Sequence, residues 1–179
     1  MNPENPRKIV FHIEATGASV EGGHRIVELA AVEMLDGRFT YRSYRTFVNP
    51  DRPIDEGAQA VHGISDDYVV GAPVFEEIAE ELSEFLRGAE LIVHNAPFQV
   101  AFLDMEFEQA GLPSSQRLCT DVTDTLDLAR RLRPKQKNDL DTLIRDFSIQ
   151  TPTRTLNGAE LDAYLIGLIS LELHKPWLH

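Results

Sequence analysis

The chain has 179 residues, 42% hydrophobic and 26% charged, which is enough to bury the core of one globular domain. Its net charge of −12 argues against a broad basic surface for non-specific nucleic-acid binding, but it leaves room for nucleic acid held in a small cleft or delivered by a partner. No apolar run could span a bilayer, the first residues lack a signal-peptide core, and the single Cys119 excludes an internal disulfide. We therefore expect a cytoplasmic protein with no membrane partner.

The first part of the chain predicts three strands with hairpin links. Alternating apolar residues place these strands at residues 8–14, 25–35 and 38–48. The dipeptide Asp36-Gly37, between the second and third strands, is a typical hairpin turn. The stretch 49–72 is rich in Pro, Gly and Asp, so it is expected to be an irregular connection.

The rest of the chain alternates helices and strands. Helices are predicted at residues 74–87, 98–110, 124–132, 138–147 and 158–174, and strands at 90–95 and 118–122. Asp124 is expected to be the N-cap of its helix. This order predicts an α/β fold with a mixed sheet flanked by helices. We expect one domain over residues 8–174, a flexible N-terminus at 1–7 and a C-terminal tail at 175–179.

The first predicted strand carries the stretch IVFHIEATG. Side chains two residues apart in a strand share a face, so Ile9, Phe11 and Ile13 are expected to point into the core. His12 and Glu14 then point together to the opposite side, near the end of the strand. Sites in α/β proteins are usually built at such strand ends.

The last predicted helix carries a carboxylate at the head of an apolar stripe. Asp162 lies on the same face as Ile166, Ile169 and Leu173. Desolvating a lone charge is costly, so Asp162 needs a partner, which a metal, a ligand proton or a buried donor could provide. Backbone amides at the start of the helix could also serve.

The chain resembles the DEDDh (DnaQ-like) 3′–5′ exonucleases, in particular the proofreading epsilon subunits of bacterial DNA polymerase III. The matching motifs are IVFHIEATG, GHRIVELAAVEM, VHGIS, LIVHNAPFQVAFLDMEF, DTLDLARR and RTLNGAELDAYL, and the resemblance as a whole covers about residues 8–173. The resemblance implies a ribonuclease H-like fold, whose mixed five-stranded sheet has three antiparallel strands followed by two parallel ones. It also implies a replicative polymerase, or another replication or repair protein, as a partner.

In that family, four carboxylates hold two divalent metals and a histidine is the general base. By the resemblance, Glu14 and Asp162 match the family pattern. His12 and Gln99 stand where the pattern has aspartates, and Asn157 stands in the position of the base. We therefore expect a degenerate site in which the catalytic set is not intact.

These substitutions predict an impaired or inactive enzyme. An amide such as Asn157 cannot take a proton, and losing a general base costs about 10²–10⁴ in rate. We expect no cofactor, with His12 a neutral replacement hydrogen-bonded to Glu14 or Asp162. Alternatively, His12, Glu14 and Asp162 offer one nitrogen and two carboxylates, a set that suits a single manganese or zinc ion better than a magnesium pair.

Other nearby carboxylates are poor substitutes for the missing ones. Asp104 is rotated about 140° from Gln99 on the predicted helix, and Glu106 lies about 10 Å further along it. Asp121 and Asp124 lie near a strand end and are expected to have no catalytic part.

The surroundings of the site match the family better than its centre does. By the resemblance, six residues could form a pocket for a nucleotide or a 3′ end, although each could also be kept for the fold. They are Thr16, Gly17, Val61, His62, Asn95 and Phe98. We expect a binding or scaffold protein in DNA replication or repair that binds single-stranded DNA or a nucleotide weakly. The alternative is an active, divergent exonuclease that uses a transition metal.

Overall fold

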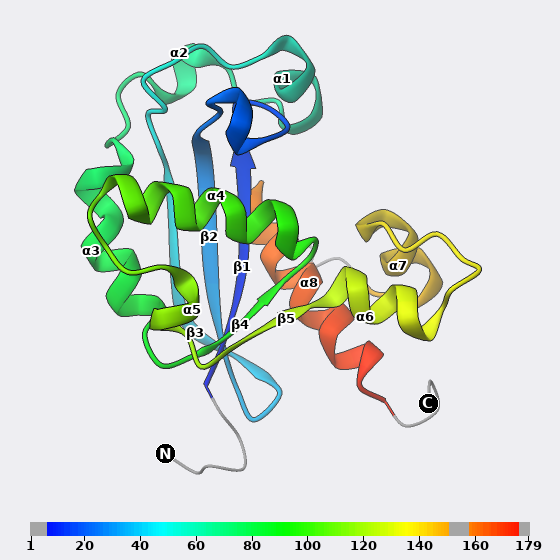
Figure 1. Cartoon of the computed structure of the whole chain (residues 1–179). Helices are drawn as coiled ribbons and strands as arrows, with labels where there is room; N and C mark the ends of the chain where they lie inside the picture. Colours follow the sequence, from blue (N-terminus) through cyan, green and yellow to red (C-terminus); the bar gives the residue numbers. More distant parts are fainter. Residues whose placement is uncertain (1–6, 151–157, 176–179) are drawn as a thin grey trace.

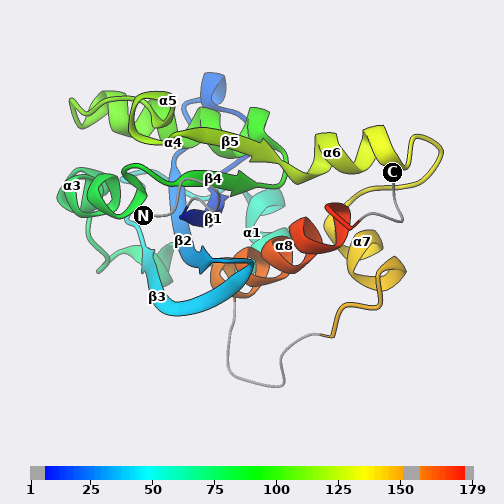
Figure 2. The same cartoon turned by 90° about the horizontal axis from the view of Figure 1, so that it is seen from below.

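The computed structural model describes residues 7–150 and 158–175. Its centre is a five-stranded sheet in the order β3-β2-β1-β4-β5, with helices on both faces (Figures 1 and 2). The strands are β1 Lys8–Ala15, β2 Ile26–Leu35, β3 Arg38–Phe47, β4 Glu90–Val93 and β5 Asp121–Asp124. The first three pair antiparallel, while β4 pairs parallel with both β1 and β5. The predicted fold class and sheet order are confirmed.

The helices agree with most of the predicted ranges. They are α1 Glu56–His62, α2 Asp66–Val69, α3 Phe75–Leu86, α4 Ala96–Gln109, α5 Ser115–Leu118, α6 Thr125–Leu132, α7 Leu140–Asp146 and α8 Ala159–Leu173. Within the described ranges, none of these helices has both the length and the apolar character needed to cross a membrane.

Two expectations about secondary structure were wrong. The stretch 49–72 contains α1 and α2 rather than only irregular chain. Helix α1 ends at His62 and is capped by Gly63, whose φ of 75° favours glycine. The strand predicted at 118–122 lies at 121–124. Leu118 and Cys119 are buried because they close onto the main core from α5, and their apolar character was misread as strand pairing.

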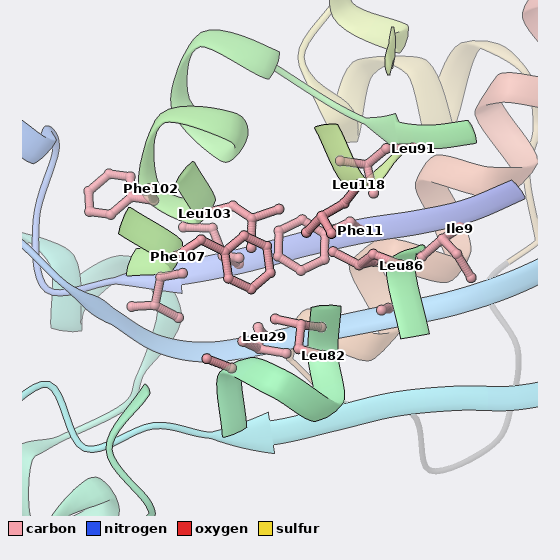
Figure 3. Packing of buried hydrophobic residues seen from close by; sticks show 14 of the residues in the cluster. Ile9, Phe11, Leu29, Leu82, Leu86, Leu91, Phe102, Leu103, Phe107 and Leu118 are labelled. Carbon is pink, nitrogen blue, oxygen red and sulfur yellow. The ribbon is translucent and has the colours of Figure 1, made fainter. Parts of the chain in front are cut away.

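One face of the sheet carries the main core, beneath α3 and α4 (Figure 3). Ile9, Phe11 and Ile13 of β1 point into it, as the alternation predicts. From α4, Phe107 packs edge-on against Phe75 of α3, with ring centroids 5.7 Å apart. Burying such aromatic side chains is a large source of stability, and this contact fixes α4 against α3.

The other face of the sheet is covered by α8. Its predicted apolar stripe is confirmed, because Ile166, Ile169 and Leu173 are fully buried. Ile166 belongs to the same cluster as Val10 of β1. The packing holds the first turn of α8, and with it Asp162, beside β1 (Figure 1).

The end of β1 extends beyond its parallel neighbour (Figure 1). The pairing with β4 stops at Val10, whereas β1 continues to Ala15. Backbone groups of β1 past that point have no strand on the β4 side, so they need other partners. The start of α4 supplies one of them, as described below.

Candidate functional site

His12, Glu14 and Asp162 converge where β1 ends and α8 begins. Nε2 of His12 lies 3.4 Å from Oε1 of Glu14 and 3.5 Å from Oδ2 of Asp162. One donor atom from each residue can be chosen so that all lie within 4.8 Å of one another. All three side chains are half-buried. The structure therefore brings together the three residues that the sequence proposed as a group.

Gln99 fixes the proton of His12. The backbone N–H of Ile13 donates to Oε1 of Gln99 at 2.9 Å, so the other end of this amide is its NH₂ group. That group lies 3.3 Å from Nδ1 of His12 and donates to it. Because Nδ1 accepts, the neutral imidazole carries its proton on Nε2, which faces Glu14 and Asp162.

The carboxyl of Asp162 lies in an environment that disfavours its charge. Burial raises the pKa of Asp162, and the carboxylates of Glu14, Asp141 and Glu28 act in the same direction. His12 opposes them and is the one group among the main causes that lowers this pKa. The Nε2–H of His12 therefore faces the two carboxylates and offsets part of their mutual repulsion.

The residues at this site do not fit a pair of magnesium ions. Two carboxylates, Glu14 and Asp162, contribute to the group found among the described residues, and Gln99 has its carbonyl oxygen on the backbone of Ile13. Magnesium prefers several hard oxygen ligands in octahedral geometry. Asn157, at the position of the family's base, lies outside the described residues.

Four of the six predicted pocket residues line one cavity beside Glu14. Gly17, Val61, His62 and Phe98 surround a space of about 380 Å³, with Val61 84% exposed at its rim. The backbone end of β1 and the helix α1 form two of its walls. The position of these residues is that expected of a ligand pocket, while their role stays a prediction.

Thr16 is not part of this cavity. It is fully buried, and its hydroxyl lies 3.0 Å from Nδ1 of His24 and accepts the N–H of Arg25 at 3.1 Å. The neighbouring Gly17 is needed for a close approach, since a Cβ there would come within 2.2 Å of the His24 ring. Both residues have a structural reason to be present.

Asn95 and His62 each occupy a special position. Asn95 has a φ of 72° before α4 and lies beside the cavity rather than in it. His62 lines the cavity, and both of its ring nitrogens are engaged. Nε2 lies 3.2 Å from the carbonyl oxygen of Ala15, and Nδ1 accepts the N–H of Ile64 at 3.0 Å. The imidazole is therefore held rigidly between α1 and β1.

Asp55 and Ala58 also line the cavity, and the sequence did not single them out. With Val61 and His62 they follow the helical spacing of α1, three and four residues apart. This signal was available, but α1 lies in a stretch that was expected to be irregular. A short helix in that connection would have predicted these residues.

The other carboxylates considered from the sequence have structural partners. Asp104 accepts the N–H of Ser115 at 2.6 Å, and Asp121 accepts that of Val122 at 2.8 Å. Glu106 is enclosed by an arginine, as discussed below. None of these carboxylates belongs to the His12 group.

Asp124 joins the starts of two helices. Its carboxylate caps α6, as predicted, by accepting the N–H of Leu126 at 2.9 Å. The same carboxylate accepts the N–H groups of Asn95 and Ala96 before and at the start of α4, at 3.0 and 2.9 Å. One side chain therefore fixes two helices next to the site.

Comparisons with known proteins identify the family of this chain. The exonuclease family model (RNase_T) matches residues 9–166. The DNA polymerase III epsilon subunit of Pasteurella multocida is 40% identical over 179 residues, covering 97% of this chain and 71% of that protein. The epsilon subunit of Escherichia coli strain K12 is 39% identical over 173 residues, covering 93% of this chain and 71% of that protein.

Solved exonucleases share the fold. Exonuclease X, solved in complex with 5′-overhanging duplex DNA, aligns with a TM-score of 0.68 and 26% identity over 93% of this chain and 89% of that one. The nuclease domain of 3′hExo, a DEDDh family member bound to rAMP, aligns with a TM-score of 0.76 and 15% identity over 97% and 94%. The chain therefore belongs to the exonuclease family, together with the epsilon subunits of DNA polymerase III.

Proposed function

We propose that this chain is a non-hydrolysing member of the exonuclease family. In this proposal it holds a nucleotide or the 3′ end of a DNA strand in the cavity beside Glu14, and it acts as a binding or scaffold protein in DNA replication or repair. One observation carries the proposal: the amide of Gln99 directs the Nε2 proton of His12 at the two remaining carboxylates.

A nitrogen that carries a proton cannot bind a metal ion, because coordination needs its lone pair. For His12 to bind a metal through Nε2, its proton would have to move to Nδ1 and face the NH₂ group of Gln99. Turning the amide of Gln99 would remove that conflict, but it would set the NH₂ group against the N–H of Ile13. Either change gives up a buried hydrogen bond, at about 1–3 kcal/mol.

The cavity supports a binding role. Phe98 and Val61 offer apolar surface for a base or sugar, and Glu14 at its edge can accept a hydrogen bond from a sugar hydroxyl. Two family relatives with this fold are described in complexes with DNA or with rAMP. Because the relatives in sequence are subunits of DNA polymerase III, we propose a replicative polymerase as the partner.

The test is a nuclease assay on single-stranded and mismatched 3′ ends in magnesium and in manganese. We expect no trimming by the natural chain. A variant that restores the family residues, His12→Asp with Gln99→Asp and Asn157→His, should gain trimming that magnesium supports. Trimming by the natural chain that Glu14→Ala abolishes would refute the proposal.

A second candidate function rests on the spacing of the His12, Glu14 and Asp162 donor atoms, which lie within 4.8 Å of one another. Such a group could hold one manganese or zinc ion in a divergent nuclease. Calorimetry with each ion decides between the two candidates. Tight binding that is lost in both His12→Ala and Glu14→Gln would favour the metal enzyme, whereas no binding is the outcome that our proposal expects.

A further inference from the structure

A basic segment stands out in this acidic chain. The chain carries a net charge of −12, yet five of its 17 basic residues fall within eight positions, and residues 128–138 contain no acid. The five are Arg130, Arg131, Arg133, Lys135 and Lys137. They lie in the last turn of α6 and in the connection from α6 to α7 (Figure 1). A concentration of like charge next to a site indicates an anionic ligand.

This connection has a defined shape. Arg133 is buried, pairs with Asp146 of α7 and donates to the side-chain oxygen of Gln136. The side-chain amide of Asn138 donates to the backbone oxygens of Arg133 and Gln136, at 3.2 and 2.9 Å. The neighbouring Arg131 is paired with Asp127 at 3.3 Å. The segment is therefore held by its own contacts, and some of its cations are already neutralised.

Two of the cations face a groove outside any ion pair. Arg130 and Lys137 line a groove of about 760 Å³, and within the described residues neither forms an ion pair or a hydrogen bond, although Lys137 is close enough to Asp139 to lower the pKa of that carboxyl. The one carboxylate that lines this groove, Asp139, is engaged at the start of α7, where it accepts hydrogen bonds from the N–H and the hydroxyl of Thr142. The groove thus offers two cationic side chains that no ion pair holds in place.

The groove leads to the cavity beside Glu14. Asn95 lines both the groove and a smaller space of about 270 Å³, and Phe98 lines that space and the cavity. His94 also lines the groove, immediately before Asn95. Its position is fixed by the hydrogen bond of 2.9 Å between its Nδ1 and the hydroxyl of Thr125. A single extended ligand could therefore run from the cavity to the groove.

We propose that Arg130 and Lys137 bind the phosphates of a single nucleic-acid strand whose 3′ end lies in the cavity beside Glu14. This rests on the proposed function and adds to it that the ligand is a polynucleotide rather than a mononucleotide. Among the described residues, His94 contributes the one aromatic ring that lines the groove, so the contacts are to the backbone and should be independent of base sequence.

The test measures binding of a labelled oligothymidylate of about 12 nucleotides by fluorescence anisotropy, in EDTA so that no cleavage intervenes. Salt is raised from about 20 to about 200 mM. For a single strand, each phosphate contact contributes about 0.7 to the slope of log K against log salt. Arg130→Gln and Lys137→Gln should each lower this slope by about 0.7, and the double variant should bind at least about tenfold more weakly at low salt.

The matched control is Arg131→Gln, which removes the same charge from the adjacent position but from a residue paired with Asp127. This variant should leave the slope unchanged. The proposal is overturned if the natural chain does not bind the oligonucleotide at low salt, or if Arg130→Gln and Lys137→Gln behave like the control. It is also overturned if polyglutamate binds through Arg130 and Lys137 and the oligonucleotide does not.

The two proposals can fail separately. Trimming of 3′ ends by the natural chain would refute the proposal that it does not hydrolyse DNA. The salt slopes measured in EDTA would still test whether Arg130 and Lys137 bind phosphates. Conversely, Phe98→Ala could weaken the binding of a mononucleotide while Arg130→Gln and Lys137→Gln leave the salt slope unchanged. This result would support nucleotide binding in the cavity and refute phosphate binding in the groove.

Discussion

The guanidinium of Arg25 encloses the carboxylate of Glu106, and the side chain of Glu106 is 0% exposed. Nε and Nη2 of Arg25 lie 2.9 and 2.7 Å from its two oxygens, and the N–H of Ile26 donates to it at 3.1 Å. This contact joins the start of β2 to α4, the helix that carries Gln99. It therefore helps to fix the position of Gln99 in the candidate site.

The two halves of this pair should differ in what their loss costs. Arg25→Met leaves a buried charge without its cation, and we expect the free energy of unfolding to fall by about 3–5 kcal/mol. Glu106→Gln keeps an acceptor for the N–H of Ile26, and Arg25 stays partly exposed, 3.4 Å from Glu76. We therefore expect the free energy of unfolding to fall by only about 1–2 kcal/mol. Urea denaturation measures both values. Equal losses would contradict the asymmetry.

The tautomer of His12 is directly measurable. We expect the ¹⁵N chemical shifts of the natural chain near neutral pH to show the Nε2-protonated form, because Gln99 donates to Nδ1. Gln99→Met removes that donor, so a mixture of tautomers should appear. An Nδ1-protonated His12 in the natural chain would show that the amide of Gln99 does not set the proton.

Asp124 should matter more to stability than an ordinary helix cap. Asp124→Ala removes an acceptor from the starts of both α4 and α6, at an expected cost of about 2–4 kcal/mol. The matched change Asp139→Ala uncaps α7 alone and should cost about 1 kcal/mol. Chemical denaturation of the two variants compares them. Similar losses would mean that the contacts of Asp124 with α4 contribute little.

His94 gives stability a definite pH dependence. Burial is the main cause that lowers the pKa of His94, and Arg130 and His12 act in the same direction against Asp124 and Asp139. The unfolded chain therefore takes up the proton first as the pH falls below about 6.5, so His94 contributes a loss of stability between that pH and its lower folded pKa. His94→Asn keeps a donor for Thr125 but binds no proton, and its stability should fall less steeply over this range. An unchanged slope would contradict the assignment.

The sheet was predictable because alternation and turn chemistry are local signals. The apolar face of β1 and the stripe of α8 could each be derived from residue spacing, and both proved buried. The short helices α1 and α2 were missed because a few residues at helical spacing are a weak signal in a stretch rich in Pro, Gly and Asp. Leu118 and Cys119 looked like a strand because burial by a turn and burial in a sheet leave the same apolar pattern.

The residues that meet at the candidate site could be predicted from the sequence, but the hydrogen bonds around them could not. Resemblance to the family brought His12, Glu14 and Asp162 together, and the structure confirms that they meet. The sequence could not show that the oxygen of Gln99 is engaged by Ile13, because this depends on β1 extending past β4. Nor could it show that the hydroxyl of Thr16 is buried against His24, 8 residues away in sequence.

The extension of β1 beyond β4 also bears on which residues position 99 can accept. Gln99 is an acceptor for the main chain of β1, so position 99 serves the fold as well as the site. An aspartate there has a shorter stem and could not replace that contact, and it would bring a third acid towards Glu14 and Asp162. Gln99→Asp alone is therefore expected to give a less stable protein. Positions 12 and 99 are coupled through the amide of Gln99, which contacts both Nδ1 of His12 and the backbone of Ile13.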